Sequence, residues 1–194
     1  VRSSAASDVY KRQILVLSFI CCSVYAKDVD YEQVYRDLEV PSHKYVHDVD
    51  PGEYYDTQTS TWSPYPLLRL LAPIYFKTIA IEPGYYLLTP REHKGNWYML
   101  FKENGKIKYI VPIYDREIVP EFFYDENLPK PKLSPTQKMH LGMLDFIGKF
   151  VPSAKRKPAP QTYLELTDLD NHFISLVVYW GNYRYYTIFR TIQM

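Results

Sequence analysis

The sequence predicts a mainly β protein, and three observations support that fold class. The 194 residues include 20 Tyr and 15 Pro but only 7 Gly, a composition that favours strands and turns over long helices. Apolar and polar residues alternate over much of the chain after residue 72, as they do in half-buried strands. Short turn sequences at 104–105 and 181–182 separate alternating runs. We therefore expect an SH3-like barrel or a small β-sandwich built from meander hairpins, with two short α-helices at about 30–39 and 135–150.

The overall composition is that of an ordinary globular domain. Hydrophobic residues make up 46% of the chain and charged residues 23%, and the formal net charge is +1. These values argue against a disordered or coiled-coil chain and give no general signal for nucleic acid, so we expect no nucleic-acid partner. The charge is nevertheless uneven, because residues 27–60 carry nine acids and three bases while residues 129–160 carry seven bases and one acid.

The first residues read as two segments that precede the folded protein. Eleven consecutive residues within 1–13 match the translation of a transposon sequencing adapter, so we interpret residues 1–13 as a sequencing artefact. Residues 14–26 begin with an apolar run that is too short to span a bilayer and end in the small residue Ala26. This pattern predicts an N-terminally truncated signal peptide. We therefore expect export to the periplasm or the extracellular space, with a mature chain that starts at Lys27.

The predicted mature chain divides into an acidic lead-in and a β-rich domain. In the lead-in, residues 27–66, Asp30 is a suitable N-cap for the first helix, and Pro41 ends that helix before a Pro-rich loop. Residues 67–194 form the β-rich domain, which carries a Pro-rich helical insertion at 120–160. Both Cys residues lie in the predicted signal peptide, so the mature chain can form no disulfide.

The strongest local signal in the β-rich domain is the Asn-Gly pair at 104–105. An Asn-Gly pair between alternating runs predicts a type I′ hairpin. The expected register pairs Glu103 with Lys106 and Phe101 with Lys108. Further strands are expected at 74–81, 85–89, 162–167, 173–180 and 183–192, the last three as a meander.

The second predicted helix, 135–150, starts at a capping box formed by Ser134 and Gln137, with Pro135 at its first position. Large apolar residues then recur on one face: Met139, Met143, Phe146, Ile147 and Phe150. Two explanations fit this face. The helix docks over an open face of the sheet, or it makes a peripheral contact with a membrane, for which its basic flanking residues are suited.

The chain contains none of the common catalytic motifs. It has no nucleophile elbow, P-loop, dinucleotide fingerprint or HExxH sequence, so we assign no catalytic residue, no metal site and no cofactor. His43 and His47 are four residues apart, so they could bind one metal ion together only if they lay on a helix. The neighbouring Pro residues disfavour a helix here. Asp48 and Asp50 belong to an incomplete calcium-loop pattern, and residues 168–172 are better explained as a turn.

The candidate ligand-binding residues lie on the polar face of the last predicted hairpin: Tyr179, Arg184, Tyr186 and Arg190. The expected register places Tyr179 opposite Arg184. Aromatic rings beside guanidinium groups can stack on sugar rings and can bind carboxylates or phosphates. Cross-strand Tyr–Arg pairs also stabilise sheets that bind no ligand.

These observations favour an exported, non-catalytic binding or structural protein of the cell envelope, whose partner is a glycan, a wall polymer or an envelope protein. Two alternatives stay open. A secreted or periplasmic hydrolase would have to use His47, Asp48 and Asp50, and a small outer-membrane-associated protein would have to accommodate 15 Pro.

Overall fold

The computed structural model describes residues 29–59, 64–129, 134–150 and 160–193. The chain divides into two units, Val1–Asp30 and Tyr31–Met194, and the described helices and strands lie in the second unit. The predicted artefact and signal peptide, residues 1–26, lie outside the described residues.

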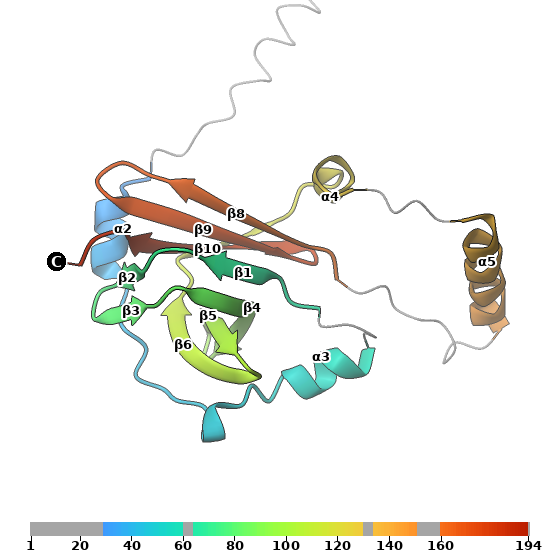
Figure 1. Cartoon of the computed structure of the whole chain (residues 1–194), viewed down its shortest axis with the longest axis horizontal. Coiled ribbons are helices and arrows are strands. Elements are labelled where there is room, and N and C mark those ends of the chain that lie inside the picture. The colour runs from blue at the N-terminus through green and yellow to red at the C-terminus, as the bar shows by residue number, and fades with distance from the viewer. Residues whose placement is uncertain (1–28, 60–63, 130–133, 151–159, 194) are drawn as a thin grey trace, which may run out of the picture. The chain divides into compact units, whose positions relative to one another are not determined.

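The described strands form two antiparallel sheets (Figure 1). The first sheet has the order β1-β4-β5-β6 and consists of β1 (Leu67–Leu70), β4 (Gly84–His93), β5 (Asn96–Glu103) and β6 (Lys106–Pro112). The second has the order β3-β2-β10-β9-β8, with β7 also paired to β10, and consists of β2 (Ile74–Phe76), β3 (Ile79–Ile81), β7 (Asp115–Ile118), β8 (Thr162–Asp168), β9 (Phe173–Trp180) and β10 (Tyr183–Arg190). The mainly β class is thus confirmed. Neither sheet closes on itself in the described residues, so the SH3-like barrel is not confirmed.

The main hydrophobic core contains side chains from both sheets. Phe101 of β5 meets Phe189 of β10 edge to face, with ring centroids 6.0 Å apart, and both side chains are fully buried. Trp97 of β5 contacts Tyr185 of β10 at 5.3 Å. Burial of each such large apolar side chain stabilises the fold by about 1.5–3 kcal/mol.

The other face of the second sheet is covered by two short helices, α2 (Tyr31–Asp37) and α4 (Phe123–Asn127). Successive residues of a strand point to opposite sides of the sheet. The residues next to Phe173 and Tyr179 in β9 pair with core residues of β10, so Phe173 and Tyr179 point to the face away from the main core. The ring of Tyr35 in α2 lies 5.3 Å from that of Phe173. The ring of Phe123 in α4 stacks on Tyr179. The face that was predicted to be polar is therefore largely buried.

Both predicted helices and the C-terminal meander are present in the structure. α2 falls within 30–39, and α5 (Pro135–Phe150) has the predicted bounds. The capping box is formed: the amide N–H of Ser134 donates to Gln137 Oε1 at 2.9 Å, and the amide N–H of Gln137 donates to Ser134 Oγ at 3.4 Å. The register of β9 and β10 is also as predicted.

The predicted register of the β5–β6 hairpin holds for Glu103 with Lys106 and for Lys102 with Ile107, and it is wrong beyond these two pairs. Asn104 and Gly105 have φ angles of 52° and 76°, as a type I′ turn requires. A β-bulge then places Tyr109, and not Lys108, opposite Phe101. The bulge has a clear physical advantage, because it keeps the charge of Lys108 away from the core face that Phe101 occupies.

Three other expectations need correction. The strand expected at 74–81 is a hairpin of β2 and β3, which turns at Lys77 with a φ of 50°. The strand expected at 85–89 continues through Pro90 as part of β4. Pro90 has no N–H to donate, but β1 pairs only with Gly84–Leu87, so among the described residues β4 has a neighbouring strand on only one side at Pro90. The Pro-rich loop expected after Pro41 contains α3 (Glu53–Thr59) and the 3₁₀ helix η1 (Val46–Asp48).

Candidate functional site

The four residues predicted as one ligand-binding face are placed in two separate surroundings. Tyr179 is 3% exposed, and its ring stacks on Phe123 with centroids 4.2 Å apart. Arg184 forms an ion pair with Glu117 at 2.5 Å, and the hydroxyl of Tyr186 donates to the same carboxylate at 2.7 Å. These three residues are therefore engaged with groups of β7 and α4 and with one another.

Arg190 lies at the other end of β10. Its Nη2 donates to both carboxylate oxygens of Glu32 at 3.0 and 3.1 Å, and its guanidinium lies 4.6 Å from the centroid of the Phe173 ring. It borders a hollow of about 450 Å³ beside α2, together with Tyr75 and Lys77. The four predicted residues thus lie on one face of the second sheet but at two separate places on it, and their binding of a ligand stays a prediction.

The three residues considered for hydrolysis also do not converge. His47 and Asp48 are exposed in η1, with φ angles of 55° and 57°. Asp50 is 2% exposed, and its carboxylate accepts hydrogen bonds from Arg91 Nε at 2.9 and 3.0 Å and from Lys102 Nζ at 3.2 Å. A carboxylate held in this way by two cations serves to fix the chain.

Asp50 is the centre of a buried charge network that the sequence analysis missed. Burial alone would raise the pKa of the Asp50 carboxyl, but the hydrogen bond and charge of Arg91 and the charge of Lys102 hold it below its usual range. Arg91 also pairs with Asp56 at 2.6 Å, and Lys102 pairs with Glu53 at 3.0 Å. The network attaches the segment that carries α3 to β4 and β5. One signal was available: Lys102 interrupts the apolar run of β5.

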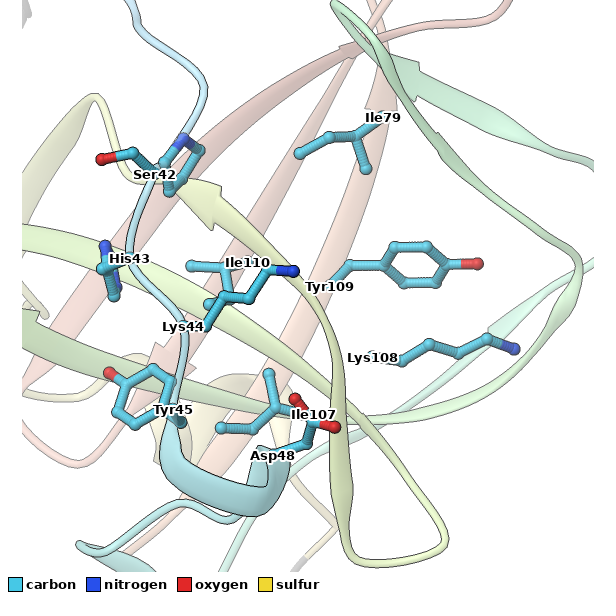
Figure 2. A pocket seen from close by; sticks show the side chains of 11 residues that line it. Ser42, His43, Lys44, Tyr45, Asp48, Ile79, Ile107, Lys108, Tyr109 and Ile110 are labelled. Carbon is cyan, nitrogen blue, oxygen red and sulfur yellow. The ribbon is translucent and has the colours of Figure 1, made fainter.

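A groove of about 480 Å³ lies between residues 41–48 and β6 (Figure 2). Its apolar lining includes three isoleucines: Ile79, Ile107 and Ile110. Ile107 is 8% exposed, and the other two are partly exposed. The groove thus has an apolar base.

Polar and aromatic side chains surround this base. Figure 2 shows Lys44 extending from the 41–48 segment across Ile110 in the direction of Tyr109. Lys108 and Asp48 also line the groove. The Lys108 ammonium lies 5.7 Å from the centroid of the Tyr109 ring. Lys44, Lys108, Asp48 and Tyr109 thus all line the groove, and the register of β6 directs Tyr109 to the face of the strand opposite that of Ile107 and Ile110.

The groove runs beside an edge strand, and that edge is blocked against further strand pairing. β6 is the last strand in its sheet order. Its bulge at Lys108 and the missing N–H of Pro112 both disfavour another strand. A ligand in the groove would therefore be recognised by side chains and not by a ladder of backbone hydrogen bonds.

The wall formed by residues 41–48 is held in place by an aromatic stack. His43 stacks on His93 of β4, with ring centroids 4.2 Å apart and an angle of 10° between the planes. The edge of Tyr98 meets the His43 ring at 4.6 Å. Burial, and then the charges of His93 and Lys94, lower the pKa of His43. The stack at one end and the Asp50 network at the other fix the wall to the first sheet.

This groove is not evident from the sequence. Its residues come from a segment with no regular periodicity and from two strands that are distant in the sequence. The spacing of Lys44 and Asp48 alone gave no reason to connect them with Tyr109.

No family model, no curated protein and no solved structure matches this chain.

Proposed function

We propose that this protein is an exported, non-catalytic binding protein of the cell envelope that holds a glycan chain in the groove between residues 41–48 and β6. The observation that carries the proposal is the partly exposed Tyr109 ring, which lines an apolar-based groove together with Lys44, Lys108 and Asp48. The predicted signal peptide supports export, and the separation of His47 from the buried, paired Asp50 disfavours the hydrolase.

The chemistry of the groove suits a saccharide. A binding site typically combines an apolar or aromatic surface with a few polar groups that fix orientation. The Tyr109 ring offers a face for the C–H groups of a sugar ring, while the ammonium groups and the Asp48 carboxylate can bond its hydroxyls.

The position of the groove supports binding without large rearrangement. The open β-sandwich that we infer for the two sheets provides one wall, and the segment fixed by the His43 stack and the Asp50 network provides the other. A wall fixed in advance loses less conformational entropy on binding, and this increases affinity.

The proposal is tested by screening the chain from Lys27 onward on a glycan microarray and on insoluble peptidoglycan and chitin. For any retained glycan, Tyr109→Ala is expected to weaken binding at least about tenfold, which corresponds to about 1.4 kcal/mol. The matched control is Tyr85→Ala, because Tyr85 is 57% exposed on β4 and does not line the groove.

A second variant avoids the core, because Tyr109 also packs against core residues. Lys44 is exposed on the groove wall, so Lys44→Ala should weaken binding without lowering the melting temperature. Lys94→Ala, at an exposed turn outside the groove, is its control. If a retained glycan binds all four variants equally, the groove is not the site. Loss of binding in Arg184→Ala instead would place the site on β10, and a screen that retains no glycan would contradict the glycan proposal itself.

A further inference from the structure

α5 exposes a row of large apolar side chains. Met139 is 77% exposed, Met143 63%, Phe146 62% and Phe150 73%, while Ile147 is 37% exposed. The sequence left two explanations for this row, docking on a sheet and contact with a membrane. A contiguous exposed apolar surface normally marks an interaction site.

These side chains share one face of the helix. At 3.6 residues per turn, Met139, Met143, Phe146 and Phe150 repeat at steps of three or four and therefore lie in one stripe. The edge of Phe146 meets Phe150 with ring centroids 5.2 Å apart, so the two rings form one apolar unit. Leu141 lies on nearly the opposite side of the helix and is 46% exposed.

Charge identifies the kind of surface that this stripe fits. Lys138 and Lys149 are exposed and lie beside the stripe, where their long chains can place ammonium groups at the level of lipid headgroups. The region 129–160 has seven bases and one acid. Basic residues around an exposed apolar stripe complement an anionic, partly apolar surface, which is the surface that an acidic lipid bilayer offers.

The dimensions of α5 indicate its orientation. It has 16 residues, fewer than the roughly 20 needed to cross a bilayer. Among the described residues, no helix is long and apolar enough to span a membrane. An amphipathic helix of this length lies in the plane of the interface, with its apolar stripe inserted between headgroups.

We propose that α5 is a membrane-surface helix that binds anionic lipid bilayers through Met139, Met143, Phe146, Ile147 and Phe150, with Lys138 and Lys149 contacting lipid headgroups. This inference is independent of the proposed glycan site. The formed capping box at Ser134 supports it, because α5 then starts from satisfied backbone groups and keeps its apolar stripe presented for insertion.

The experiment measures co-sedimentation of the chain from Lys27 onward with lipid vesicles. This chain contains the whole unit Tyr31–Met194 and lacks the apolar segment at 14–24, which would itself bind vesicles. Binding is expected to vesicles of equimolar phosphatidylcholine and phosphatidylglycerol, and at least tenfold weaker binding to phosphatidylcholine alone. Added salt should weaken the first, because part of the attraction is screened Coulomb energy.

Two variants separate the apolar and electrostatic contributions. Phe146→Ser with Phe150→Ser should reduce vesicle binding at least tenfold, whereas the matched control Leu141→Ser, on the opposite side of α5, should leave it within twofold. Lys138→Glu with Lys149→Glu should lower binding to anionic vesicles by about fivefold or more for each lysine and leave binding to phosphatidylcholine unchanged.

A site-specific measurement distinguishes insertion from indirect effects. The chain from Lys27 onward has no Cys, so a single Met143→Cys variant can carry an environment-sensitive fluorophore. Its emission should shift to the blue on addition of anionic vesicles, and the same label at Leu141→Cys should shift much less. The proposal is overturned if neither label responds, if Leu141→Ser weakens binding as much as the phenylalanine pair, or if the phenylalanine variants instead convert a dimer to a monomer in sedimentation.

Discussion

The substitution Asp50→Asn tests whether the buried charge network holds the segment of residues 41–59 on the first sheet. Asn keeps the size of the side chain and removes its charge. The change leaves Arg91 with Asp56 and Lys102 with Glu53, because those pairs do not involve Asp50. It deprives both cations of the carboxylate that they share.

The expected cost follows from the burial of these groups. The Asp50 side chain is fully buried and the Lys102 side chain is 1% exposed, so neither charge is compensated by water. Removal of one partner from a buried ion pair costs about 3–5 kcal/mol. We expect the lower end, about 3 kcal/mol, because Arg91 and Lys102 each retain one acidic partner. For a chain of this size the melting temperature should fall by roughly 6–12 °C.

Urea unfolding and thermal melting measure the loss, with Asp48→Asn as the matched control. Asp48 is exposed two residues away, so the same substitution there should change the unfolding free energy by less than about 0.5 kcal/mol. Lys102→Met added to Asp50→Asn removes the uncompensated ammonium and should restore part of the stability. Equal stability of the two Asn variants would refute the argument that the network fixes this segment.

The pH dependence gives an independent measure of the same pairing. Because the pKa of Asp50 is lowered in the folded protein, its contribution is present above the unfolded value of about 3.9 and is lost as the pH falls through the folded value. The difference in unfolding free energy between the native chain and Asp50→Asn should therefore shrink as the pH decreases below about 4. A difference that stays constant to pH values of about 2 would show that folding does not lower the pKa of Asp50.

Three further predictions concern other parts of the chain. Gly105→Val should destabilise the fold by about 1–3 kcal/mol through its positive φ alone, since nothing lies within 4 Å of an added Cβ, and an unchanged melting temperature would disprove the turn type. The double variant Arg184→Ala with Arg190→Ala should lower the free energy of unfolding measured in urea, because each arginine is paired with an acidic residue of this chain. Unchanged stability together with lost glycan binding would instead support a ligand role for these residues. N-terminal sequencing of exported protein should begin at Lys27, and a mature chain that keeps residues 14–26 would refute the signal peptide.

Much of the local structure follows from the sequence because its signals are local. Asn104-Gly105 produced a turn with two positive φ angles, and the Ser134 capping box begins α5 at Pro135. The register of β9 and β10 follows from the short turn at 181–182. In each case a few neighbouring residues determine the backbone conformation, so no distant contact is needed to predict it.

The sequence by itself therefore determined the β class, both hairpin partners of β9 in the C-terminal meander, and the amphipathic face of α5. The tertiary structure decided which faces are exposed. Alternation predicted a polar face at Tyr179, but α4 covers it with Phe123, since a sheet face is open only where no other segment packs. The groove beside Tyr109 and the pairing of Asp50 with Lys102 likewise join residues that are distant in the sequence, and only the packing of the whole chain brings such side chains together.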